Sequence, residues 1–109
     1  MVTVRDRNII ELCLACKEHC ERYLNEGVTM YPKLSTVCTQ LLTECSEICS
    51  YTANALKRET PFSQEICHLC ELICEACGNE CSVQIDLTNM SKSADLFYEL
   101  AENCRYRFV

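Results

Sequence analysis

Twelve of the 109 residues are cysteines, and their spacing is the feature of this sequence that could do chemistry. In the segment ICHLCELICEACGNECS, residues 66–82, five cysteines recur at alternating gaps of three and four. That is the spacing of one face of a helix, where leucine is a usual residue. On a helical wheel the five thiols fall within an arc of about 80°. They are Cys67, Cys70, Cys74, Cys77 and Cys81.

The remaining cysteines repeat this pattern in three other segments of the chain. In the first segment, three cysteines lie on the same helical face as Ile9. In the second, three lie on one face among leucines, and in the last segment one lies on the apolar face. They are Cys13, Cys16 and Cys20, then Cys38, Cys45 and Cys49, and finally Cys104. We therefore expect all twelve thiols to point into one interior.

Thiols at this spacing are suited to binding soft metal ions. Residues three or four apart on a helix have Cβ atoms about 5–6 Å apart, so two sulfurs can hold one ion between them. Thiolates select Cu(I), Zn(II) or iron–sulfur clusters. Zinc prefers a closed set of four ligands, and the loop motif of bacterial ferredoxins is absent. Because Cu(I) accepts two or three sulfurs, many Cu(I) ions along a thiol-lined core match the pattern best.

Other interpretations of the cysteines stay open. The thiols could form a redox sensor, in which helix-paired cysteines oxidise, or they could bind zinc or an iron–sulfur cluster in a helical protein. In an exported chain they could form a disulfide scaffold. They could also be packing residues of a helical interaction module, because cysteine is a small and often buried hydrophobe. Five consecutive core cysteines would nevertheless fill a helix interface poorly.

Charge and the N-terminal segment bear on partners and compartment. The net charge of −6 argues against nucleic acid and against an anionic membrane surface. The start MVTVRDRNIIELC shows no apolar secretory segment, and no apolar run approaches the roughly 20 residues that span a bilayer. We expect a cytoplasmic protein with reduced thiols. No Ser-His-Asp set or phosphate-binding loop is present, so we do not expect an enzyme.

Helical periods divide the chain into four segments with short connections. The segments are 5–25, 33–58, 61–83 and 91–108. Gly27 follows the first, Thr60 and Pro61 begin the third as N-cap and first helical residue, and 84–90 form a connection. Short connections make consecutive helices antiparallel neighbours. The sequence therefore predicts one domain, residues 1–109, folded as an all-α antiparallel up-down-up-down four-helix bundle.

Two helices carry apolar residues that need a separate explanation. The face of the fourth segment is formed by Phe97, Leu100, Ala101, Cys104 and Phe108. The third has a second apolar face beside its thiols, formed by Phe62, Ile66, Leu69, Leu72, Ile73 and Ala76. A helix that is apolar on both sides is usually buried on both sides, so we expect a homo-oligomer, either a dimer or a tetramer.

Four further side chains could bind copper. His19 lies near the edge of the thiol face and His68 points away from it, so boundary or surface positions are expected for both. Met30 and Met90 fall in connections at one end of the bundle, where thioethers could receive Cu(I).

The runs CLACKEHC, CTQLLTECSEIC and CHLCELICEACGNEC resemble the cysteine-rich four-helix-bundle copper storage family of bacteria. The similarity covers about residues 9 to 82. It implies a bundle, often tetrameric, whose core cysteines bind and store many Cu(I) ions, and it carries over to the eleven cysteines from Cys13 to Cys81. The fourth segment departs from the family pattern, because Cys104 is its single cysteine. This departure implies a lower capacity and leaves room for sensing or delivery.

Overall fold

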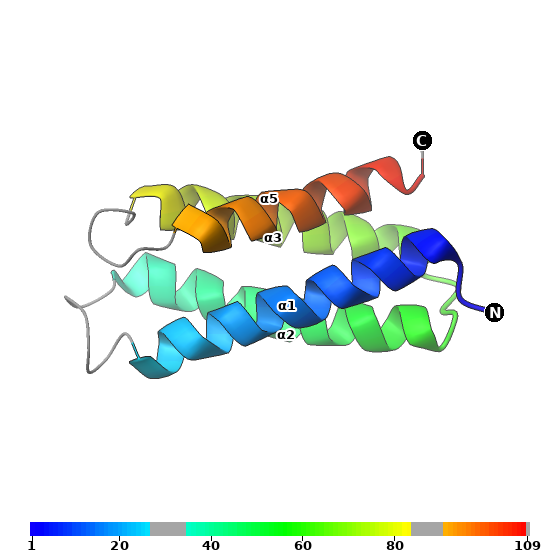
Figure 1. Cartoon of the computed structure of the whole chain (residues 1–109), viewed down its shortest axis with the longest axis horizontal. Coiled ribbons are helices and arrows are strands. Elements are labelled where there is room, and N and C mark those ends of the chain that lie inside the picture. The colour runs from blue at the N-terminus through cyan, green and yellow to red at the C-terminus, as the bar shows by residue number, and fades with distance from the viewer. Residues whose placement is uncertain (27–34, 84–90, 109) are drawn as a thin grey trace.

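The computed structural model describes residues 1–26, 35–83 and 91–108, with the side chains of 26, 81–83 and 91–93 excepted (Figure 1). These residues form four helices and no strand. The helices are α1 Val4–Glu26, α2 Thr36–Lys57, α3 Ser63–Val83 and α5 Ser91–Tyr106. The all-α prediction is therefore confirmed, and Gly27, Met30, Leu34 and Met90 lie outside the described residues.

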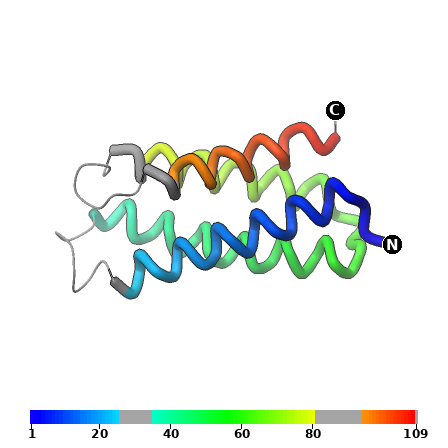
Figure 2. The backbone as a smooth tube through the Cα atoms, in the orientation of Figure 1, coloured from blue at the N-terminus to red at the C-terminus, as the bar shows by residue number. Residues whose placement is uncertain are grey.

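Consecutive helices run in opposite directions along a bundle of 44 × 22 × 19 Å (Figures 1 and 2). The α1 helix packs against α2 and α5, and α3 packs against the same two helices from the opposite corner. Both chain termini lie at one end of the bundle, where α2 also ends and α3 begins (Figure 1). The predicted up-and-down four-helix bundle is thus the observed arrangement.

Local capping fixes the start of α2. The Ser35 hydroxyl accepts a hydrogen bond from the backbone N–H of Cys38 at 3.0 Å, which is the usual role of an N-cap serine. The same hydroxyl donates to the Glu80 carboxylate on α3 at 3.2 Å. The cap therefore also ties the start of α2 to the last turns of α3.

The link between α2 and α3 is tight, and it shifts the predicted start of α3. The N–H of Arg58 donates to the carbonyl of Asn54, and Glu59 adopts a left-handed backbone conformation with φ of 54°. Thr60 Oγ1 accepts from the N–H of Phe62 at 3.1 Å within this turn, so the prediction that Thr60 is the N-cap of α3 is wrong. The N–H of Ile66 donates to the carbonyl of Phe62 at 3.0 Å, and α3 starts at Ser63, two residues after the predicted residue 61.

The core is made largely of sulfur, with a few large side chains among the thiols. The described cysteine side chains are all at most 2% exposed. The largest fully buried apolar side chains are Phe97, Ile9, Leu42, Leu56 and Leu100. Phe108 was expected on this face, and that prediction is wrong. It is 41% exposed, because α5 ends at Tyr106 and the following turn carries Phe108 outward over the Arg107 guanidinium, 4.4 Å from the ring centre.

Charged side chains connect the two ends of the chain at the end of the bundle where both termini lie. Arg107 donates to both carboxylate oxygens of Asp6, and the contact from Nη2 to Oδ2 measures 3.0 Å. Arg5 donates to the carbonyl of Arg107 at 3.2 Å. Since the Asp6 and Arg107 side chains are only 12% and 19% exposed, this pair is largely shielded from water. It anchors the C-terminal turn to α1.

The second apolar face of α3 is open in the single chain. Phe62, Leu69 and Leu72 are 63%, 48% and 49% exposed, while Ile66, Ile73 and Ala76 are partly buried. The predicted subunit interface stays a prediction.

None of the described helices combines the length and apolar character that a membrane crossing requires.

Thr52 gives a stability prediction. Its hydroxyl is fully buried on α2 and finds no hydrogen-bond partner among the described residues. A buried hydroxyl without a partner costs free energy, so Thr52→Val should raise the free energy of unfolding of the reduced, metal-free chain by about 1 kcal/mol. Urea denaturation followed by circular dichroism measures this change. A destabilised variant would show that the hydroxyl does have a partner.

The open face of α3 gives a prediction about assembly. We expect the chain to form a dimer or tetramer at micromolar concentration, and we expect Leu69→Glu combined with Leu72→Glu to give a monomer. Light scattering measures the mass directly. Val37→Glu on α2, at a side chain that is 53% exposed, is the matched control and should leave the mass unchanged. A monomeric mass for the unaltered chain would contradict the predicted interface.

Candidate metal centre

Thiols from three helices occupy the same interior and approach one another closely. The Cys45 sulfur lies 3.8 Å from that of Cys49 on its own helix and 3.8 Å from that of Cys74 on α3. The sulfurs of Cys70 and Cys74 are 3.9 Å apart. The pairs Cys45–Cys49 and Cys70–Cys74, each separated by four residues, therefore form as predicted, and the contact between Cys45 and Cys74 joins them across α2 and α3.

The described thiols gather into three groups of three, and within each group all sulfurs lie within 4.8 Å of one another. Two of these groups take one cysteine from each of α1, α2 and α3. The groups are Cys13 with Cys49 and Cys70, Cys20 with Cys45 and Cys77, and Cys45 with Cys49 and Cys74. No set of four such sulfurs occurs among the described residues.

Antiparallel packing explains why these particular cysteines meet. In an antiparallel pair of helices the residue numbers of facing positions add to a constant. The residue numbers have the same sum in the pair Cys45–Cys74 as in the pair Cys49–Cys70. Two successive turns of α2 therefore face two successive turns of α3. The cysteines of α1 lie at the same positions along the bundle axis. Cys13 therefore meets Cys49 and Cys70, and Cys20 meets Cys45 and Cys77.

Hydrogen bonds between the thiols and their burial set the protonation of the core. Hydrogen bonding to Cys13 and to other thiols, followed by burial, raises the pKa of Cys49. Hydrogen bonding to Cys45, followed by burial, raises the pKa of Cys74. The acceptor Cys45 has a lowered pKa, because Cys20 and other thiols donate to it. Because their pKa values are raised, the thiols of Cys49 and Cys74 stay protonated at neutral pH when no metal is bound.

A further pair lies at the end of the bundle that holds the chain termini. Cys104 on α5 is hydrogen-bonded to Cys67 and to Cys70 on α3, and these bonds together with burial raise its pKa. The bond from Cys104 lowers the pKa of Cys67, and the positive charge of Arg107 acts in the same direction. Cys104 therefore connects α5 to the thiol network through Cys70.

Some predicted ligands lie outside the three groups. Cys16 is fully buried, and its thiol donates to the carbonyl of Leu96 on α5 at 3.8 Å. Cys38 is also buried, whereas the side chain of Cys81 lies outside the described part of α3. His19 is partly buried, and burial lowers its pKa, while His68 is exposed. Among the described residues neither histidine joins a group of three metal-binding side chains.

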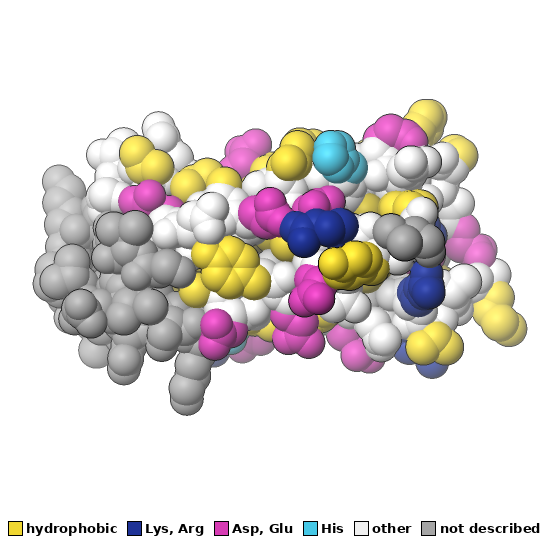
Figure 3. Space-filling model, turned by 90° about the horizontal axis from the view of Figure 1, so that it is seen from above, with side chains coloured by type: hydrophobic (Ala, Val, Ile, Leu, Met, Phe, Trp, Pro, Cys, Tyr) yellow, Lys and Arg dark blue, Asp and Glu magenta, His cyan; other side chains and the backbone are white. Residues whose placement is uncertain are grey.

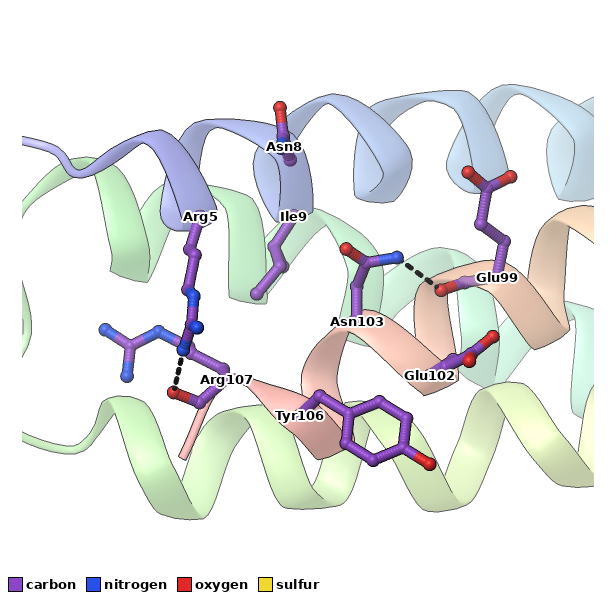
Figure 4. A pocket seen from close by; sticks show the side chains of 8 residues that line it. All are labelled: Arg5, Asn8, Ile9, Glu99, Glu102, Asn103, Tyr106 and Arg107. Carbon is purple, nitrogen blue, oxygen red and sulfur yellow. Dashed lines mark hydrogen bonds between the residues drawn. The ribbon is translucent and has the colours of Figure 1, made fainter. Parts of the chain in front are cut away.

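A large surface hollow lies elsewhere and contains no thiol (Figure 4). It measures about 450 Å³ and lies between α1 and α5, with Arg5 and Arg107 at one end and Glu99 near the other. Ile9 forms its wall toward the core, and the Asn103 amide donates to the Glu99 carbonyl at 2.9 Å. Without soft ligands, this hollow is separate from the candidate metal centre.

Two features of the site were not found by sequence reasoning. Thr52 follows Cys49 by three residues and continues the buried stripe of α2, so its position in the stripe was a usable signal. The pair of Asp6 and Arg107, near Cys67, joins residues from opposite ends of the chain. No local pattern signals such a pair.

Comparison with known proteins places these features in a family. A family model described as copper storage protein matches residues 3–108 of the chain. A relative from Bacillus subtilis (strain 168), described as the uncharacterized cysteine-rich protein YhjQ, is 36% identical over 100 residues. That match covers 88% of this chain and 89% of the relative.

Solved structures of high similarity agree with that match. Cu(I)-bound copper storage protein BsCsp3 is 32% identical, with a TM-score of 0.85 over 93% of this chain and 95% of its own. Apo-Csp3 from Bacillus subtilis is also 32% identical, with a TM-score of 0.74 over 91% and 94%. A protein from Nitrosospira multiformis is 27% identical, with a TM-score of 0.83 over 93% and 92%. With a family model that spans nearly the whole chain, this protein belongs to the copper storage protein family.

Proposed function

We propose that this chain binds and stores several Cu(I) ions through the cysteine thiolates of its core. The observation that carries the proposal is the set of three buried groups, each with three sulfurs within 4.8 Å. Three soft sulfurs at this separation suit Cu(I), whereas structural zinc takes a closed set of four. The Cu(I)-bound state of the similar BsCsp3 supports the same metal.

The proposed ligands include every cysteine of the chain. The described thiols form one connected interior, and Cys81 continues the stripe of α3 by sequence. The ligands are Cys13, Cys16, Cys20, Cys38, Cys45, Cys49, Cys67, Cys70, Cys74, Cys77, Cys81 and Cys104. Because Cys45 and Cys49 each belong to two groups, neighbouring ions would share sulfurs and form a cluster.

The arrangement supports storage and buffering without catalysis. The thiols bind their cargo from several sides in a buried interior. Copper uptake is an exchange of ligands in which Cu(I) replaces thiol protons. The thiols must stay reduced for this exchange, which fits the cytoplasm. The described cysteines are all free of disulfides.

The first test is the amount of copper that the reduced chain takes up. Anaerobic titration with Cu(I) against a competing chelator should give more than about two ions per chain, since each group of three sulfurs suits one soft ion. Two or fewer ions would contradict storage. A competing Zn(II) titration that saturates at one tightly held ion would favour a zinc protein.

A pair of variants then tests the groups themselves. Cys45→Ala removes the sulfur that two groups share, so it should lower the number of bound Cu(I) ions by at least one. Ile48→Ala removes a partly buried side chain without sulfur from the same helix and should keep the full number. Equal copper contents in the two variants would show that Cys45 is not a ligand.

Copper affinity should rise with pH. Hydrogen bonding to other thiols and burial raise the pKa of Cys49 and Cys74, so both sulfurs are protonated in the metal-free chain near neutral pH. Cu(I) must displace these protons, and lower pH therefore favours the metal-free chain. Each proton released makes the logarithm of the binding constant rise by about one per pH unit. Competition titrations between about pH 6 and pH 8 measure the slope, and a flat profile would contradict thiolate binding.

A further inference from the structure

A small hollow on the surface between α3 and α5 reaches the thiol core from the side. Its volume is about 170 Å³. It is lined by Gln64, His68, Glu71, Cys104, Arg105 and Phe108. Cys104 is only 2% exposed, so it forms the buried wall of the hollow, whereas Phe108 is 41% exposed at the rim.

A histidine, a carboxylate and a guanidinium lie together at the mouth of the hollow. His68 Nδ1 lies 3.8 Å from Glu71 Oε1, and Arg105 Nε donates to the other oxygen of Glu71 at 2.8 Å. On the face formed by α3 and α5, a histidine lies beside a basic side chain flanked by acidic ones (Figure 3).

Sulfur continues inward from the wall of the hollow. Cys104 packs in the buried core with Cys67 and Cys70, the two thiols whose hydrogen bonding raises its pKa, and Cys70 belongs to the group with Cys13 and Cys49. The wall of the hollow therefore belongs to the same buried cluster as the sulfurs of that group.

The other residues of α5 make this position distinctive. Phe97, Leu100 and Ala101 face the core and are at most 1% exposed, so hydrocarbon separates the thiols from water along most of the helix. Cys104 is the one cysteine in the last segment of the chain, residues 91–109. On the side of the bundle formed by α5, Cys104 is therefore the one residue of that helix that offers a sulfur ligand to a metal ion.

We propose that Cu(I) enters and leaves the core sideways through the hollow between α3 and α5, with Cys104 as the first core sulfur to take it and Cys67 or Cys70 as the next. This route rests on the proposed storage function. The donor would be a Cu(I) complex of a small thiol. One donor–copper bond breaks as the bond to Cys104 Sγ forms, and the Cys104 proton leaves with the released donor thiolate. Copper stays Cu(I) throughout, and no electrons are transferred.

The rate of copper loading tests this route separately from the final amount of copper. Reduced protein is mixed anaerobically with the Cu(I) complex of bicinchoninate, whose visible absorbance falls as copper leaves it. Cys104→Ala should slow the loading of every ion at least about tenfold while capacity falls by no more than one ion. Cys20→Ala, in the group with Cys45 and Cys77, is the matched control and should lose capacity without slower loading.

A second pair of variants keeps every thiol in place. Phe108→Ala widens the rim and should speed loading several-fold, because the side chain is exposed and lies outside the packed core. Tyr106→Ala removes an exposed aromatic side chain at the same end of the molecule, in the separate hollow between α1 and α5, and should leave the rate unchanged.

The outcomes separate the two proposals. Equal loading rates for Cys104→Ala and Cys20→Ala would overturn the sideways route, and so would equal rates for Phe108→Ala and Tyr106→Ala. In both cases a full copper content of the unaltered chain would leave storage standing. An unaltered chain that takes up no Cu(I) would overturn storage and the route together.

Discussion

The alignment of the helices along the bundle axis is the constraint on which the thiol interior depends. A slip of one residue moves a side chain by 1.5 Å along the axis and turns it by 100°, which would separate the sulfurs of every group. Contacts without sulfur hold this alignment. Ser35 ties α2 to Glu80 on α3, Arg107 ties the C-terminal turn to Asp6 on α1, and Arg105 ties α5 to Glu71. These polar contacts act together with the packing of the buried core to hold the thiols in register.

A core of thiols buries less hydrocarbon than a core of leucines would. Larger apolar side chains offset this loss at several positions along the bundle axis. Ile9 and Leu56 fill the core near the chain termini, and Phe97 and Leu100 fill it along α5. Buried hydrocarbon contributes about 25 cal/mol per Å², so these side chains supply the apolar stabilisation that the smaller thiols do not. The bundle can therefore hold its sulfurs in place before any metal arrives.

The sequence predicted the helices, their directions and the burial of the described thiols, because a helical period of apolar residues is a local signal. It placed the start of α3 two residues early, because Thr60 accepts from Phe62 ahead of the first helical bond. It also placed Phe108 inside, because nothing in the periodicity shows that α5 ends at Tyr106. The composition of each group of three sulfurs depends on how helices distant in sequence align. That alignment involves contacts between residues distant in sequence, such as Asp6 with Arg107, which no local pattern reveals.

The departure of the last helix from the thiol pattern gives the core two kinds of wall. The three groups of three sulfurs use only α1, α2 and α3, so these helices hold the geometry suited to cargo. Phe97 and Leu100 make most of the α5 side impermeable to a charged ion, because a metal cannot cross hydrocarbon without ligands. A fully closed store would retain copper but exchange it slowly. The single sulfur of Cys104, set against a surface hollow at one height of α5, allows retention and exchange in the same bundle.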